Sequence, residues 1–167
     1  AKEVQKAEKA REAGQCMGEA LPELRDIMHK IKETYDVHKS NVGVGSTIFA
    51  VKPGDGSARE QAASCQKVLG GWANIANEYA TKRYRSNLIN WGMLPFIIDK
   101  GELPFENGDY IFIPEIQDAI KNKVSTIKAF VVNKDMKEFE LKLDELTDDE
   151  RQIILDGCLI NYYRENK

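Results

Sequence analysis

Cysteine is scarce in this sequence and widely scattered. Cys16, Cys65 and Cys158 are its only three in 167 residues, and no two of them form a Cys-x-x-Cys pair. The two histidines, His29 and His38, stand apart from them. Metal sites in proteins need several ligands of this kind close together, so we expect no metal held by this chain. An odd number of free thiols is typical of a reducing compartment and predicts a cytoplasmic protein.

Long hydrophobic runs and an excess of basic residues are also missing. No apolar run approaches the ~20 residues that cross a bilayer, and there is no signal-peptide pattern, so we expect no membrane partner. The net charge is −3, which speaks against nucleic acid as a partner. The local cluster of Lys82, Arg83 and Arg85 is typical of a solvated face, with an anion site or a domain contact as the alternatives. No repeat or low-complexity linker divides residues 1–167, which we interpret as one domain.

What the sequence does contain is an alternation of strand-like and helix-like segments. Helices are expected over 2–14, 21–37, 58–69, 82–91, 114–121 and 148–164. Strands are expected over 47–51, 72–79, 95–98 and 110–113, with a hairpin of 125–132 and 138–143. Thr147 and Glu150 fit a capping box for the last helix. This mixture predicts an α/β fold, with a helical lead-in over 1–40 and a core over 41–167.

The most informative stretch is Gly54-Asp55-Gly56-Ser57-Ala58-Arg59-Glu60-Gln61-Ala62-Ala63. A glycine turn here leads from a strand into a helix, whose first N–H groups have no internal partners and favour an anion. Arg59 adds a planar fork that can bind a carboxylate with two hydrogen bonds. The stretch therefore suits a carboxylate-bearing substrate. A purely structural interpretation stays open, because Ser57 and Glu60 also fit the S-x-x-E capping box.

Two stretches resemble the motifs of one enzyme family. Residues 56–63, Gly-Ser-Ala-Arg-Glu-Gln-Ala-Ala, resemble the Gly-Ser-Ser-Arg-Glu-(His/Gln)-Ala-Ala motif in the C-terminal swivel domain of aconitase-like hydro-lyases. Residues 84–95, Tyr-Arg-Ser-Asn-Leu-Ile-Asn-Trp-Gly-Met-Leu-Pro, resemble that family's Arg-Ser-Asn-Leu-Ile-Asn-Met-Gly-Leu-Leu-Pro segment. The two fall in the family's order and at about its spacing, and the close resemblance covers residues 54–96. It implies a swivelling β/β/α domain of the aconitase C-terminal type, as a fragment of a longer multidomain hydratase.

The resemblance also implies roles for individual residues. Ser57 matches the family's serine, which acts as an alkoxide base on the carbon next to a carboxylate. Arg59 matches the arginine that binds substrate and helps to polarise that serine. The family brings a further substrate-binding arginine from a segment ahead of this motif, and Arg25 is the candidate. Family members with a [4Fe–4S] cluster take its cysteines from other domains, so the resemblance implies a cluster in the absent domains and none bound by this chain.

The function implied by the resemblance is that of an enzyme part. The domain would close over an active site built mostly by the remaining catalytic domains, for reversible dehydration of a small di- or tricarboxylic hydroxy acid. Two departures keep a different class of function open. Ala58 replaces the motif's usual second serine, and Lys52-Pro53 stand where the family usually has asparagine and an aromatic residue. The alternative is a non-catalytic anion-binding or regulatory module that kept the pocket but lost the chemistry. RNA binding, known among aconitase relatives, is a third and weaker option.

Overall fold

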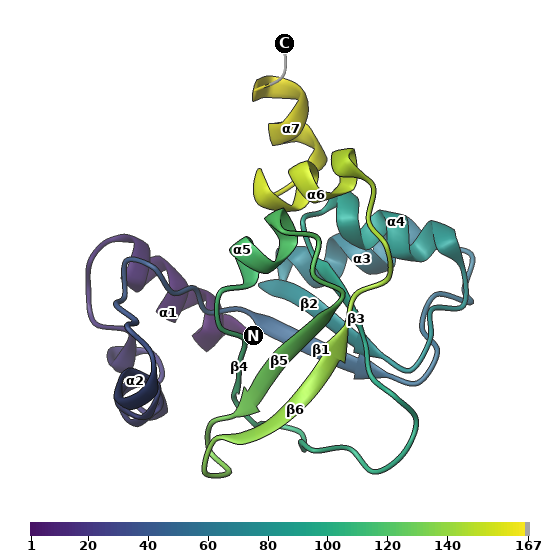
Figure 1. Ribbon diagram of the computed structural model, residues 1–167. Helices are drawn as coiled ribbons and strands as arrows, with labels where there is room; N and C mark the ends of the chain where they lie inside the picture. The colour runs from purple at the N-terminus through teal and green to yellow at the C-terminus, as the bar shows by residue number, and fades with distance from the viewer. Residues whose placement is uncertain (166–167) are drawn as a thin grey trace.

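The computed structural model describes residues 1–165 and shows a mixed six-stranded sheet with helices packed around it (Figure 1). The strands lie in the order β1-β2-β3-β6-β5-β4. The first three are parallel, and the remaining neighbours pair antiparallel. The strands are β1 Ser46–Ala50, β2 Gly71–Ala76, β3 Leu94–Ile97, β4 Ile111–Phe112, β5 Thr126–Val131 and β6 Lys137–Lys142.

Three helical elements precede β1, single helices separate β1 from β2, β2 from β3 and β4 from β5, and two helices follow β6. The helices are α1 Lys2–Glu12, the 3-10 helix η1 Met17–Glu19, α2 Glu23–Thr34, α3 Arg59–Val68, α4 Lys82–Asn90, α5 Ile116–Lys121, α6 Asp148–Leu155 and α7 Leu159–Glu165. Apart from η1 and the C-terminal helix, each element lies where the sequence predicts it, with ends shifted by a few residues. The predicted α/β class is confirmed.

The parallel half of the sheet positions the glycine turn. It is a β1-α3-β2-α4-β3 unit, and both of its helices pack on one face, where Ala63 of α3 lies in a buried cluster with Tyr84 and Leu88 of α4. Because the three strands are parallel, their carboxyl ends meet at one edge of the sheet. The segments that follow β1, β2 and β3 are therefore neighbours, which is where ligands bind in open α/β sheets.

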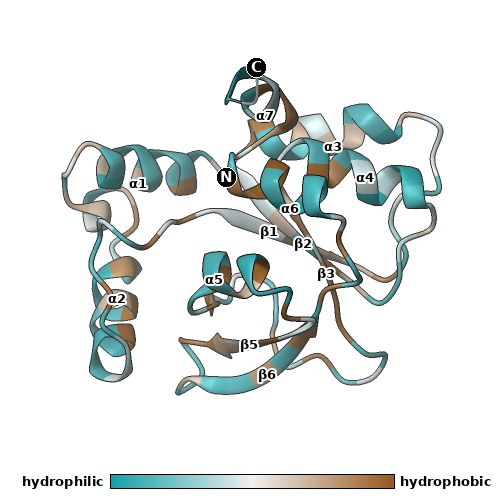
Figure 2. Cartoon of the chain, turned by 45° about the horizontal axis from the view of Figure 1, so that its top comes forward, coloured by the Kyte–Doolittle hydropathy of each residue, from teal (hydrophilic) through white to brown (hydrophobic). Residues whose placement is uncertain are grey.

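The main hydrophobic core lies on the opposite face. Ile75 and Phe96 from the parallel half pack there with Ile127, Val131 and Leu141 from the β5-β6 hairpin. Figure 2 shows that the two strands of the hairpin differ in hydropathy, with β5 largely hydrophobic (brown) and β6 largely hydrophilic (teal). The helices α1 and α2 pack separately, through a second buried cluster that includes Val132 and borders β4.

The C-terminal helix predicted over 148–164 is wrong in one respect. It is broken into α6 and α7 at residues 156–158, where Gly157 has a φ of +90°. The break follows from a close backbone approach. A Cβ on Gly92 would lie 1.8 Å from the carbonyl oxygen of Gly157, so Gly92 is restricted to glycine by this contact, while Gly157 is favoured by its own positive φ. The start of α6 is as predicted, because Thr147 and Glu150 form the full capping box.

Candidate active site

The glycine turn follows β1 and lies against α4. Gly54 has a φ of +98°, which side chains rarely allow, and a Cβ there would lie 2.5 Å from the Cβ of Tyr84. A Cβ on Gly56 would meet no atom within 4 Å, and the φ of Gly56 is not positive. Gly54 is thus the residue that lets the turn fold down onto Tyr84, while Gly56 stands in open space beside Ser57.

Arg59 begins α3 and is held by the turn. Its Nε donates to the Gly54 carbonyl oxygen at 3.1 Å, and the Thr81 hydroxyl donates to the same oxygen at 3.3 Å. These bonds orient the guanidinium. Its two Nη groups form no hydrogen bond or ion pair with any residue in the described part of the chain, so they remain available to a carboxylate.

Ser57 is exposed, and its hydroxyl has no hydrogen bond within residues 1–165. The N-cap of α3 is Ala58, whose side chain cannot accept a bond from the helix. The capping box that the sequence allowed for Ser57 and Glu60 is therefore wrong, because the helix begins one residue later than that interpretation requires. The first N–H groups of α3 are left without a side-chain cap, directly beside the serine.

A pocket of about 220 Å³ lies at the same edge of the sheet. It lies where β2 ends at Ala76, three residues earlier than predicted, and the three residues that follow the strand line it. Thr81, the N-cap of α4, joins this pocket to the turn through its bond to Gly54. The residues that line the pocket are Asn77, Glu78, Tyr79, Thr81, Lys82, Arg85, Ile97 and Asp144.

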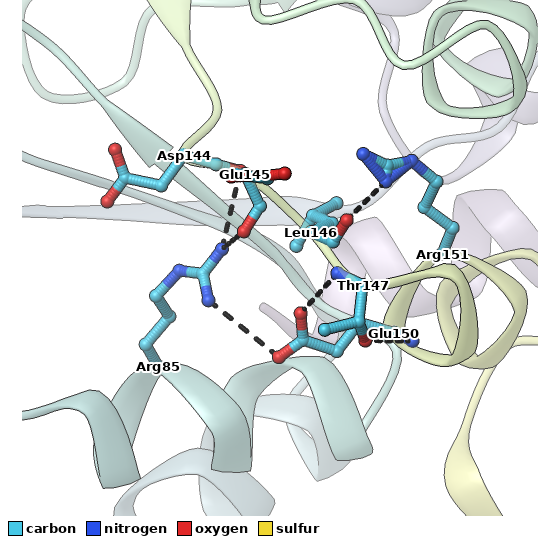
Figure 3. A network of polar contacts seen from close by, with 7 residues as sticks. All are labelled: Arg85, Asp144, Glu145, Leu146, Thr147, Glu150 and Arg151. Carbon is cyan, nitrogen blue, oxygen red and sulfur yellow. Dashed lines mark hydrogen bonds and ion pairs between the residues drawn. The ribbon is translucent and has the colours of Figure 1, made fainter.

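Arg85 differs from the other two residues of the basic cluster, Lys82 and Arg83, in its exposure to solvent. Lys82 and Arg83 are exposed, as a solvated face predicts, but only 16% of the Arg85 side chain is accessible. Its Nη2 donates to the carbonyl oxygens of Glu145 at 3.1 Å and Asp144 at 3.4 Å, and its Nη1 lies 3.8 Å from Glu150 (Figure 3). Its Nε is buried without a hydrogen-bond partner in the described structure. For Arg85 the solvated interpretation is wrong, because the β6–α6 link closes over it.

A buried polar network supports the turn from below. Gln66 of α3 donates to the side-chain oxygen of Asn74 on β2, and the Asn74 amide donates to the Tyr84 hydroxyl at 3.2 Å. The ring of Tyr84 is the surface on which Gly54 rests. Beside it, burial raises the pKa of the Tyr79 phenol, which donates to the Phe96 carbonyl at 2.9 Å. Tyr79 therefore stays protonated and acts as a brace.

Comparison with known protein families identifies the family of the domain that carries this site. Residues 7–101 match the model of the aconitase C-terminal domain family. The chain belongs to this family. The matched range contains both motifs that the sequence analysis singled out, and the predicted fold of the aconitase C-terminal type is confirmed.

Individual relatives of this aconitase C-terminal domain are hydratases and dehydratases. It is 30% identical over 156 residues to aconitate hydratase A of Rickettsia bellii, covering 89% of this chain and 17% of that protein. It is 35% identical over 116 residues to the methanogen homoaconitase small subunit of Methanocaldococcus jannaschii, covering 68% of this chain and 58% of that one. The chain thus spans less than two thirds of the length of either relative.

A solved structure shows the same architecture. The crystal structure of 3-isopropylmalate dehydratase from Methanocaldococcus jannaschii matches this domain with a TM-score of 0.56 and 28% sequence identity. The match covers 84% of this chain and 75% of that one.

The domain does not bring Arg25 to the turn. Arg25 is exposed on α2 and lies against Gly18, where a Cβ would be 2.5 Å from its Nε. Both views place α2 on the opposite side of the molecule from α3 and α4 (Figures 1 and 2). The candidate site at the turn therefore keeps Ser57 and Arg59, and Arg25 lies outside it.

The described His, Cys, Asp and Glu side chains are not grouped in a way that could bind a metal ion or an iron–sulfur cluster. The cysteines of the domain lie before η1, on α3 and before α7, and residues 1–165 contain no group of three or more His, Cys, Asp or Glu that could hold a metal ion.

Among residues 1–165, no helix is long and apolar enough to span a bilayer.

Proposed function

We propose that this domain is part of an aconitase-type hydro-lyase, to which it contributes Ser57 as the base and Arg59 as the carboxylate clamp. The substrate is a small di- or tricarboxylic hydroxy acid, dehydrated reversibly in the cytoplasm. One observation carries the proposal. The turn after β1 presents a free hydroxyl, two free Nη groups and the uncapped start of α3 together at the ligand-binding edge of a parallel sheet.

The proposed chemistry follows from these groups. Arg59 binds a substrate carboxylate and places the adjacent C–H near Ser57. The serine alkoxide takes that proton and becomes a hydroxyl, the electron pair of the C–H bond forms the C=C bond, and the C–OH bond of the neighbouring carbon breaks with its electron pair to release hydroxide. The proton now on Ser57 and the released hydroxide together make up the water that is lost, and return of that proton to solvent restores the alkoxide. The positive charge of Arg59 and the helix N–H groups stabilise the alkoxide. The reverse sequence hydrates the double bond.

The proposal includes partner domains, and the exposure of Ser57 supports this part of it. A solvated serine is a poor base near neutral pH, and Ser57 is exposed here, so another surface must close over it and exclude water. A Lewis acid that helps hydroxide to leave must also come from outside, because the described side chains offer no such site. In this proposal the remaining domains hold the [4Fe–4S] cluster, which supplies that chemistry when bound.

Reconstitution tests the division of labour. The chain alone, assayed with malate, citrate and 3-isopropylmalate by the ultraviolet absorbance of the unsaturated product, should show no turnover. Addition of the remaining catalytic domains with their cluster should restore turnover of at least one such hydroxy acid. Turnover by the chain alone, or no turnover of any hydroxy acid in the complete assembly, would contradict the proposal.

The non-catalytic alternative has one observation in its favour. Ala58, in place of the motif's second serine, stands at the N-cap of α3 and removes a hydroxyl from the site. A regulatory module of this kind would bind tricarboxylates in calorimetric titration of the complete protein without turning them over.

A further inference from the structure

We infer that the pocket beside Arg59 is a second carboxylate-binding subsite, in which the Lys82 ammonium binds the carboxylate. This inference rests on the proposed function, which places the first substrate carboxylate on Arg59. The pocket has a volume of about 220 Å³, which is enough for a short carboxylate-bearing arm. The inference assigns a place on this domain to the second carboxylate of the di- or tricarboxylic acid already proposed as the substrate.

The pocket and Arg59 are contiguous. The Thr81 hydroxyl, which lines the pocket, and Arg59 Nε both donate to the Gly54 carbonyl oxygen. The two groups are therefore no farther apart than two hydrogen-bond lengths. A di- or tricarboxylic acid bound by one carboxylate on Arg59 can reach the pocket with the next, because neighbouring carboxylates in such acids are separated by only two or three carbons.

Lys82 is the free cation in this pocket. It is exposed on the first turn of α4 and forms no ion pair with any residue from 1 to 165. The other cation, Arg85, has its Nη2 committed to two backbone carbonyl oxygens and its Nη1 3.8 Å from Glu150. Arg85 adds fixed positive charge, while the flexible ammonium of Lys82 can move to meet a carboxylate.

Two carboxylates also line the pocket and limit its affinity. Glu78 is paired with Lys52 at 3.3 Å, so its charge is partly offset. Asp144 has no ion pair in the described chain and opposes a bound anion. Because the two lining acids balance the two lining bases, binding depends on where the charges lie. Removing Lys82 or Asp144 should therefore have opposite effects.

The helix offers a matched control for Lys82. Arg83 is its neighbour, is also exposed and carries the same charge, but it does not line the pocket. We expect Lys82→Ala to weaken binding of tricarballylate, a tricarboxylate without the reacting hydroxyl, by about three- to fivefold. Arg83→Ala should weaken it less than about twofold, as expected for a distant charge in salt. Amide chemical shifts in a tricarballylate titration of the chain give both affinities.

The shifts also locate the ligand. In the natural chain they should appear at Gly54–Arg59 and at Asn77–Arg85, and Lys82→Ala should suppress the second set while retaining the first. Equal weakening by Lys82→Ala and Arg83→Ala, or no shifts at Asn77–Arg85, would overturn the subsite. In that case persistent shifts at Gly54–Arg59, lost in Arg59→Gln, would leave the proposed function standing.

A second pair tests the opposite sign. Asp144→Asn should strengthen tricarballylate binding by about two- to threefold, because it removes the opposing charge while keeping the backbone carbonyl that Arg85 uses. Glu145→Gln makes the same charge change at the next residue, outside the pocket lining, and should leave the affinity nearly unchanged. Unchanged or weaker binding in Asp144→Asn would overturn the subsite.

Discussion

Two glycines in one turn have different physical roles. Gly54 combines a φ of +98° with direct contact against Tyr84, whereas Gly56 has neither constraint. Gly54 therefore determines how closely the turn packs on Tyr84. It also fixes the position of the carbonyl oxygen that orients Arg59. Gly56 leaves the space beside Ser57 open for a substrate.

These roles predict different stability changes. Gly54→Ala should lower the free energy of unfolding by about 2–4 kcal/mol, because it adds backbone strain and displaces the Tyr84 ring. Gly56→Ala should change it by no more than about 1 kcal/mol in either direction. Urea denaturation of the two variants checks this. Equal losses, or a larger loss for Gly56→Ala, would show that the turn is not held by Tyr84.

Residue-level prediction from the sequence located the turn, because its partners are local. The glycine turn and the start of α3 could be placed from ten consecutive residues, while the roles of Ser57 and Arg59 stay predictions. Arg85 could not be assigned in the same way. Its partners are the backbone carbonyls of Asp144 and Glu145, about 60 residues away in the sequence. No pattern of side-chain types reports a contact to a distant backbone.

At the scale of elements, Arg85 fastens the β6–α6 link to α4. The link is held at both ends, since the Thr147–Glu150 capping box fixes the start of α6 while Arg85 binds the two carbonyls just before it (Figure 3). Arg151 adds a bond from α6 back to the Leu146 carbonyl. The link thus closes one side of the pocket that Lys82 lines.

Loss of this clamp should be measurable. Arg85→Met removes both bonds to carbonyl oxygens and should lower the free energy of unfolding by about 1–3 kcal/mol, with faster amide exchange in Asp148–Leu155. Arg83→Met, on the exposed face of the same helix, is the control and should change stability by less than about 0.5 kcal/mol. Unchanged exchange in α6 of the Arg85 variant would contradict the clamp.

Elements were predictable from the sequence as far as local patterns determine them. The alternation of strands and helices and the hairpin were placed within a few residues, since hydrophobic periodicity and turn residues specify them locally. The break between α6 and α7 was not, because it depends on Gly157 meeting Gly92 across the fold. The short η1 was missed for a related reason, as its three residues carry no helical period.

At the scale of the whole molecule, the Ser57–Arg59 turn lies on the parallel half of the sheet, and the β6–α6 link adds Asp144 to the neighbouring pocket. The strand order β1-β2-β3-β6-β5-β4 could not be read from the sequence, because it depends on how the hairpin joins β3. That order leaves β1 at an edge and the turn after it exposed. A molecule with its serine on an open surface is suited to work against a second surface.

The central claim is that Ser57 is the base of a hydro-lyase, and one measurement tests it most directly. It is kcat for Ser57→Ala in the complete enzyme, reconstituted with its remaining domains. Ser64→Ala is the control, because Ser64 lies on α3, the helix that follows Ser57, and within the described residues its hydroxyl donates only to the Gln61 carbonyl. We predict that Ser57→Ala lowers kcat by about 10²- to 10⁴-fold with unchanged circular dichroism, and that Ser64→Ala leaves kcat within about twofold. A Ser57→Ala enzyme that retains near-normal kcat would contradict the claim.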